Sequence, residues 1–135
     1  MIGILVVAHR PLGSALVEAA RHVYGEVERL AVLDIIPDAT TGLALARAEQ
    51  LLEDVDTGGG VLVLTDIFGA TPSNLVAALA GPHVRILAGV NLPMLIKLAS
   101  VRGTKDLADA VAAAQEAGRK YINVASKLLA GEKAS

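Results

Sequence analysis

Four short runs of consecutive apolar residues constrain the fold of this sequence more than any other feature. The four runs are Ile2–Ala8, Leu30–Ile36, Val61–Thr65 and Val84–Ala88. Three of them are rich in β-branched residues. Runs that are apolar at every position, and not only at alternate ones, are typical of strands buried on both faces. The sequence therefore predicts a parallel sheet that is covered by helices on both sides.

Stretches with helical periodicity separate these runs. Their apolar faces are Leu12, Leu16, Ala19 and Val23; Leu45, Ala48, Leu52 and Val55; Leu75, Ala78 and Leu79; and Leu107, Val111 and Ala114. Glycines mark helix ends at Gly25 and Gly118, and Asp56–Gly60 separates the second helix from the strand that follows. The alternation predicts an open, doubly wound α/β domain. Right-handed crossovers and the common order 2-1-3-4 make the first and third strands neighbours.

Composition limits the classes of protein that this chain can belong to. With 135 residues, 53% of them hydrophobic and 19% charged, it fits one folded domain, expected over residues 1–130 with a frayed tail at 131–135. Twelve basic and fourteen acidic residues give a net charge of −2, which argues against a nucleic-acid binder or a polybasic membrane anchor. The aromatic content is only 2%, so the core is expected to consist of Val, Leu, Ile and Ala.

Two absences bear on location and chemistry. The chain has no cysteine, which excludes thiolate nucleophiles and cysteine-ligated metals and agrees with a cytoplasmic setting. No apolar run approaches the roughly 20 residues that a spanning helix needs. The N-terminal run has no basic residue before it and no cleavage pattern after it, so we do not expect a signal peptide or membrane insertion.

In a doubly wound sheet, ligands bind beyond the carboxyl ends of the strands, where the strand order reverses. The first strand brings His9 to that edge, the second Asp34, the third Asp66, and the fourth the segment 89–91. Because the first and third strands are expected to be neighbours, His9 and Asp66 should lie within hydrogen-bond distance. A carboxylate on one imidazole nitrogen fixes the tautomer and leaves the other nitrogen as a nucleophile or base.

The same edge offers groups that bind anions. Thr71 resembles an N-cap followed by a proline, so a helix is expected to begin there with N–H groups around Ser73 pointing at the site. Pro11 opens the first helix, with Ser14 in its first turn, and Arg10 could neutralise a phosphate. Two helix N-termini beside one histidine can stabilise a phosphoryl group without a glycine-rich phosphate loop, and neither that loop nor a dinucleotide fingerprint is present.

Each of these residues also has a plain structural interpretation. His9 could be an ordinary surface histidine, Asp66 could cap a loop, and Asp34 is interpreted as a turn residue with a rim contact as the alternative. His22 is expected to be solvated on a helix, and His83 to lie in a loop at the opposite end of the sheet. We therefore expect no metal site and no cofactor.

Three segments resemble a known family. The first strand ending in His9, the segment Leu64–Asn74 (Leu-Thr-Asp-Ile-Phe-Gly-Ala-Thr-Pro-Ser-Asn) and the segment Ala88–Leu95 (Ala-Gly-Val-Asn-Leu-Pro-Met-Leu) resemble enzyme IIA of the mannose (mannose–fructose–sorbose) class. This class belongs to the bacterial phosphoenolpyruvate-dependent sugar phosphotransferase system. The resemblance implies that His9 is phosphorylated and that Asp66 is its hydrogen-bonding partner. It also implies that phosphate arrives from the carrier HPr and leaves to a IIB component.

The resemblance further implies a homodimer in which a terminal edge strand exchanges between subunits. The segment Tyr121–Ser126 can extend the last helix or form a short antiparallel edge strand, and the resemblance favours the strand. The family commonly has glycine after the histidine, where this chain has Arg10. Two other functions compete: a regulator that binds partners according to its phosphorylation state, and the phosphotransfer subunit of dihydroxyacetone kinase, which differs after the third strand.

Overall fold

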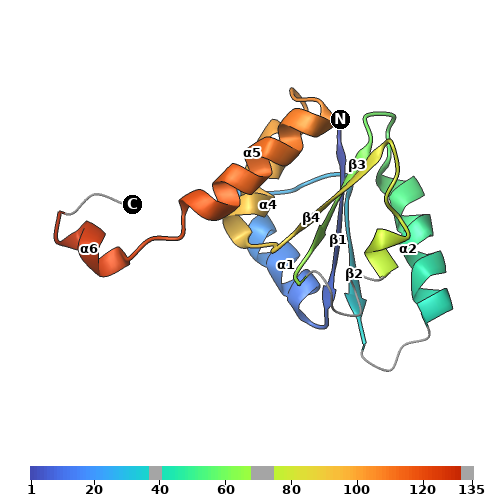
Figure 1. Ribbon diagram of the computed structural model, residues 1–135, viewed down its shortest axis with the longest axis horizontal. Coiled ribbons are helices and arrows are strands. Elements are labelled where there is room, and N and C mark those ends of the chain that lie inside the picture. Colours follow the sequence, from blue (N-terminus) through green and yellow to red (C-terminus); the bar gives the residue numbers. More distant parts are fainter. Residues whose placement is uncertain (37–40, 68–74, 132–135) are drawn as a thin grey trace.

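The computed structural model describes residues 1–36, 41–67 and 75–131 (Figure 1). Four strands form the sheet: β1 (Gly3–His9), β2 (Leu30–Ile35), β3 (Val61–Thr65) and β4 (Val84–Ala88). The labelled helices are α1 (Leu12–Tyr24), α2 (Thr41–Val55), α4 (Leu92–Val101), α5 (Leu107–Lys120) and α6 (Ala125–Leu129). Residues 75–77 are also helical.

The sheet has the order β2-β1-β3-β4, and all three strand pairs are parallel. The predicted topology and strand order are confirmed, and each strand begins and ends within one residue of the apolar run that predicted it. β1 lies between β2 and β3, with His9 opposite Ile35 and Val7 opposite Thr65. This register brings the carboxyl ends of β1 and β3 to the same edge of the sheet.

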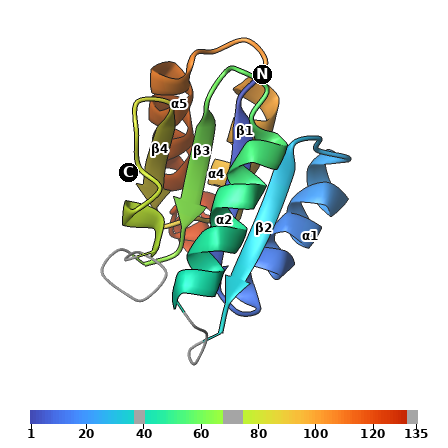
Figure 2. The same cartoon turned by 90° about the vertical axis from the view of Figure 1, so that its right-hand side faces the viewer.

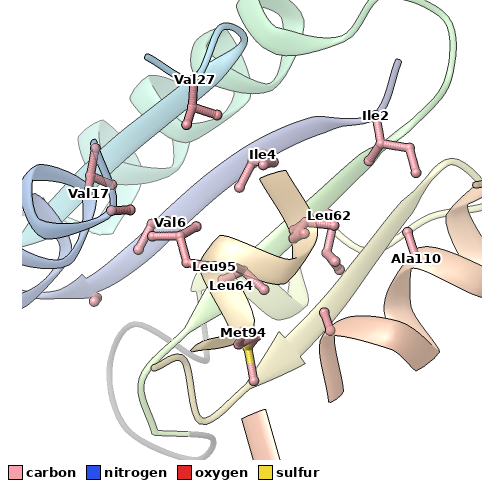
Figure 3. Close-up of a cluster of buried hydrophobic side chains, with 14 residues drawn as sticks. Ile2, Ile4, Val6, Val17, Val27, Leu62, Leu64, Met94, Leu95 and Ala110 are labelled. Carbon is pink, nitrogen blue, oxygen red and sulfur yellow. The ribbon is translucent and has the colours of Figure 1, made fainter. Parts of the chain in front are cut away.

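Helices cover both faces of the sheet. Figures 1 and 2 show α1, α4 and α5 on one face and α2 on the other. Alternate residues of β1 point to opposite faces of the sheet, and each face has its own cluster of buried hydrophobic side chains. Ile4 and Val6 belong to the cluster drawn in Figure 3, whereas Leu5 and Val7 belong to the other cluster. All four are fully buried, which explains why β1 is apolar at every position.

The predicted inner face of α1 is wrong by about one residue position. Leu12 and Val23, which the periodicity placed in the core, are 39% and 63% exposed. The residues buried instead are Gly13, Val17 and Ala20. Gly13 is the cause, because a Cβ there would come within 2.8 Å of a methyl group of Val32 on β2. The helix approaches the sheet along its small residues, so the larger Leu12 turns outward.

The sequence interpretation missed α4 and misplaced the end of α5. Asn91 caps α4: its Oδ1 accepts the backbone N–H of Met94 at 3.0 Å. Its Nδ2 donates to the carbonyl of Gly118 at 2.9 Å, which ties the start of α4 to α5. Gly118 does not end a helix, because it lies inside α5. A Cβ there would stand 2.9 Å from the Met94 side chain, so glycine serves the close packing of the two helices.

The chain beyond α5 forms neither of the two structures considered for Tyr121–Ser126. Residues 121–124 contain no helix or strand, and α6 begins at Ala125. A single copy of the chain therefore forms no edge strand here, and the exchange of such a strand between two subunits stays a prediction. A strand needs a neighbouring backbone to accept its hydrogen bonds, and this segment leads away from the sheet (Figure 1). Within the described ranges, no helix has the length and apolarity needed to cross a bilayer.

Candidate functional site

His9 and Asp66 meet at the carboxyl edge of the two central strands. His9 is the last residue of β1, and Asp66 directly follows β3. The Nδ1 atom of His9 lies 2.8 Å from Oδ2 of Asp66, and the backbone N–H of His9 donates to the same oxygen at 3.1 Å. One carboxylate oxygen thus fixes both the end of the strand and the imidazole ring that it carries.

The carboxyl group of Asp66 is ionised at neutral pH. Its burial by itself raises the pKa, but hydrogen bonds from the backbone and ring of His9 and from the N–H of Ile67, at 2.9 Å, outweigh that effect. The net result is a pKa below the ordinary value of 3.8. Because an ionised carboxylate can only accept, Nδ1 of His9 carries the proton and donates it. In a neutral imidazole with this tautomer the lone pair is on the other ring nitrogen, Nε2, and the His9 side chain is 41% exposed.

The end of β4 holds the backbone that carries Asp66. The N–H of Gly89 donates to the carbonyl of Asp66 at 3.0 Å, and the N–H of Val90 donates to the carbonyl of Thr65 at 3.0 Å. Gly89 has φ +85°, a backbone conformation that favours glycine strongly over other residues. The sequence interpretation placed Gly89 at the edge without a role. A glycine directly after a buried strand is the signal that could have indicated one.

The first turn of α1 is already occupied by a carboxylate of this chain. Asp34 lies within β2, its Oδ1 accepts the backbone N–H of Ser14 at 3.2 Å, and the Ser14 hydroxyl donates to Oδ2. The turn role expected for Asp34 is therefore wrong. The backbone N–H of Ser14, in the first turn expected to help bind a phosphoryl group, thus donates to Asp34 in this structure. A carboxylate at a helix N-terminus is electrostatically favourable, so Asp34 takes the place of an external anion.

The structure places the other candidate residues as follows. Arg10 is exposed directly beside His9, and its backbone N–H extends the pairing with β2 by donating to Ile35 at 3.0 Å. His22 is exposed on α1, and His83 is exposed just ahead of β4, at the opposite edge of the sheet. Thr71 and Ser73 lie outside the described residues.

Two further observations concern the chemistry of this edge. Over residues 1–36, 41–67 and 75–131, no group of three or more His, Asp or Glu side chains is arranged to hold a metal ion. Thr65, the last residue of β3, is fully buried, and its hydroxyl has no hydrogen-bond partner among the described residues. The pairing of His9 with Asp66 suits nucleophilic attack by Nε2 of His9, because Nδ1 of the same ring is held by the carboxylate of Asp66.

The chain thus combines a doubly wound parallel sheet with a histidine–carboxylate pair at the carboxyl edge of its two central strands. The family model of the fructose IIA component of the sugar phosphotransferase system (PTS) matches residues 3–115. The chain belongs to this family, and the resemblance stated from its sequence is confirmed.

Curated relatives agree. The chain is 31% identical over 124 residues, 90% of its length, to the PTS system mannose-specific EIIAB component of Escherichia coli (strain K12). It spans only 38% of the length of that relative. It is 32% identical over 104 residues to the PTS system fructose-specific EIIA component of Bacillus subtilis (strain 168), covering 76% of this chain and 71% of the relative.

Solved structures share the fold. A phosphotransferase system component EIIA from Streptococcus agalactiae superposes with a TM-score of 0.84 at 24% identity, covering 94% of this chain and 99% of that one. A PTS IIA protein associated with the fucose utilization operon of Streptococcus pneumoniae superposes with a TM-score of 0.80 at 27% identity, covering 93% and 95%.

Proposed function

We propose that this chain is a phosphocarrier that takes a phosphoryl group from phospho-HPr onto Nε2 of His9 and passes it to a IIB component. Membership of the PTS IIA family supports a phosphocarrier role in sugar transport. The observation that carries the residue assignment is the 2.8 Å contact between Nδ1 of His9 and Asp66. That contact occupies one ring nitrogen and leaves the other for phosphorus.

The proposed transfer balances between two imidazoles. The donor is a phosphohistidine whose other ring nitrogen is protonated. The lone pair on Nε2 of His9 attacks its phosphorus, a new P–N bond forms, and the bond to the donor ring breaks, so that the donor leaves as a neutral imidazole. His9 becomes a phosphoimidazolium that keeps its Nδ1 proton. In the second transfer a nucleophile of the IIB component attacks phosphorus, and His9 returns to its neutral form.

Asp66 has two opposed effects in this scheme. Its negative charge stabilises the positive ring that forms on His9, and its hydrogen bonds hold Nε2 toward the partner. The same charge repels the incoming phosphoryl group, which keeps the phosphohistidine reactive toward the next acceptor. We assign the task of offsetting this repulsion to the Arg10 side chain and to Thr71 and Ser73, each charge-assisted hydrogen bond being worth about 1.5–3 kcal/mol.

Assembly and location complete the proposal. We infer a homodimer that acts in the cytoplasm with HPr and a IIB component, without a cofactor. The family resemblance supports the dimer, and so does the exposure of Tyr121, Ile122 and Val124, which are 57–74% exposed in a single copy.

Incubation with radiolabelled phosphoenolpyruvate, enzyme I and HPr tests the proposal. We expect one phosphate per chain, labile in acid and stable in base as a phosphoramidate is. His9→Ala abolishes the label, whereas His22→Ala and His83→Ala, at two exposed histidines away from this edge, retain it. Full labelling of His9→Ala contradicts the assignment. Labelling without onward transfer to any IIB component would instead favour a regulator that senses its own phosphorylation.

A further inference from the structure

Three of the five lysines in the chain line one recess between α4 and α5. All five lysines lie beyond residue 96, and the chain as a whole has a net charge of −2. The recess has a volume of about 210 Å³, and its lining consists of Lys97, Lys105, Ala113, Glu116, Ala117, Lys120 and Tyr121. With three ammonium groups and one carboxylate in its lining, the recess is cationic although the protein is acidic.

The lysines of this recess are not neutralised by carboxylates of the described chain. All three are exposed, and among the described residues the one ion pair is that of His9 with Asp66. Lys120 makes a cation–π contact instead, with its Nζ atom 5.8 Å from the centre of the Tyr121 ring. Ammonium groups that share a recess repel one another, so an anion bound among them is favoured electrostatically.

An apolar groove adjoins the lysine recess. It has a volume of about 320 Å³, lies between the same two helices (Figure 1), and is lined by Leu92, Pro93, Ile96, Lys97, Ser100, Ala117 and Tyr121. Lys97, Ala117 and Tyr121, the C-cap of α5, line both spaces, so the groove and the recess are continuous. Apolar walls with a few charged groups at one end are typical of sites for small molecules.

We infer that the groove and the lysine recess together bind a small organic anion with an apolar body, of the kind represented by an aromatic phosphate. The apolar body lies against Leu92, Pro93 and Ile96, and the anionic group lies among the lysines. The positive charge of the recess favours an anion over a neutral or cationic molecule. The apolar walls favour an organic anion over inorganic phosphate, because the groove gains only from apolar surface that leaves water.

This site is separate from the histidine edge. His9 lies at the end of β1, whereas the groove lies between two helices that cover one face of the sheet, and neither His9 nor Asp66 lines it. Binding of the organic anion is therefore expected to be the same in His9→Ala. The inference and the phosphocarrier assignment can fail independently, because the first is read from binding and the second from phosphate labelling.

Titration of the isotope-labelled, full-length protein with naphthyl phosphate, followed by NMR, tests the site. This probe carries an apolar ring system and one phosphate group, whereas naphthol and inorganic phosphate each supply one of the two parts. We expect naphthyl phosphate to bind at least roughly 10-fold more tightly than either part, because only the whole molecule uses both spaces. The shifts of backbone amide signals are expected to be largest in residues 92–100 and 113–121.

Variants of exposed or partly exposed residues test the two halves of the site separately. Lys97→Gln combined with Lys120→Gln removes two charges, and Ile96→Ser removes apolar surface from the groove. Each change is expected to weaken binding of naphthyl phosphate roughly 10-fold. Lys127→Gln on α6 and Leu43→Ser on α2 are the matched controls at exposed positions outside both spaces, and they are expected to bind like the natural protein. The amide spectrum of each variant checks its fold.

Four results would overturn the inference. The first is a lack of saturable binding of naphthyl phosphate. The second is a set of shifts that centres on His9 or on residues 122–131, which would place the probe elsewhere. The third is unchanged affinity in the double lysine variant, which would mean that the ring system binds without help from the charges. The fourth is inorganic phosphate that binds as tightly as naphthyl phosphate, which would mean that the groove takes no part.

Discussion

Oδ2 of Asp66 accepts two hydrogen bonds from His9, one from the ring at 2.8 Å and one from the backbone at 3.1 Å. The second carboxylate oxygen accepts the N–H of Ile67 at 2.9 Å. Both oxygens are thus used as acceptors, and no side chain with a single acceptor can replace them. An asparagine would present its NH₂ group either to His9 or to Ile67, and one set of donors would lose its partner.

For this reason we expect Asp66→Asn to slow phosphorylation of His9 by phospho-HPr roughly 100-fold without unfolding the domain. The ring loses both its fixed orientation and the negative charge that stabilises the imidazolium. Single-turnover transfer of radiolabelled phosphate measures the rate, and circular dichroism checks the fold. Equal rates in Asp66→Asn and the natural protein would show that the contact has no part in transfer.

The lowered pKa of Asp66 predicts a loss of stability in acid. Because its pKa in the folded chain lies below the ordinary value of 3.8, the unfolded chain binds the proton more readily. The contribution of Asp66 is complete above the ordinary pKa and is lost as the pH falls through the lower, folded value. We expect the free energy of unfolding to depend less on pH below about 4 in Asp66→Asn than in the natural protein. Urea titrations at a series of pH values measure this, and parallel curves would contradict it.

Thr65 offers a stabilising substitution beside the site. Its hydroxyl is fully buried and lacks a hydrogen-bond partner in the described chain. Thr65→Val keeps the shape of the side chain and removes the unpaired polar group, so the free energy of unfolding is expected to rise by about 1 kcal/mol. Thr65→Ser keeps the hydroxyl, loses the methyl group and is expected to be less stable than the natural protein. A Thr65→Val protein that unfolds more easily would mean that the hydroxyl has a partner.

Gly89 is expected to matter through its backbone alone. Its φ is +85°, and the space that a Cβ would take is open to a distance of 4 Å, so Gly89→Ala meets conformational strain but no steric clash. We expect a loss of about 1–2 kcal/mol in unfolding free energy. Phosphorylation is expected to be slower as well, since the Gly89 N–H holds the backbone of Asp66. Urea titration and single-turnover labelling measure the two effects.

Gly42→Ala on α2 is the matched control for this variant. Gly42 also has open space around it, and its φ lies outside the left-handed range. Alanine there is expected to leave stability unchanged or to raise it slightly. Equal effects of the two substitutions on stability would show that the Gly89 conformation carries no special strain.

The strands and their order could be predicted from the sequence because burial on both faces leaves a strong local pattern. Every residue of β1 from Ile4 to Ala8 is fully buried, so the run is continuous and its boundaries are sharp. The approach of His9 to Asp66 then follows from strand order alone. Neither inference requires knowledge of how any helix packs.

The features that were missed depend on contacts between distant parts of the chain. The phase of α1 is set by a close approach at Gly13, which no periodicity records. Asp34 binds the first turn of α1 through its hydrogen bond from Ser14, which lies 20 residues earlier in the sequence. For Tyr121–Ser126, the sequence could not show that the segment leads away from the sheet after α5 and does not turn back to the edge strand β4.

The central position of β1 has a consequence for the order in which the protein folds. His9 and Asp66 are separated by 57 residues, and β1 has partners on both sides. The first strand to be synthesised therefore stays without half of its neighbours until β3 has followed, and loop closure of that length must precede the last part of core formation. Assembly of the His9–Asp66 pair thus coincides with the pairing of β1 and β3. A chain in which β3 has not yet paired with β1 cannot hold His9 against Asp66, so under the proposed function it is not yet competent for phosphoryl transfer.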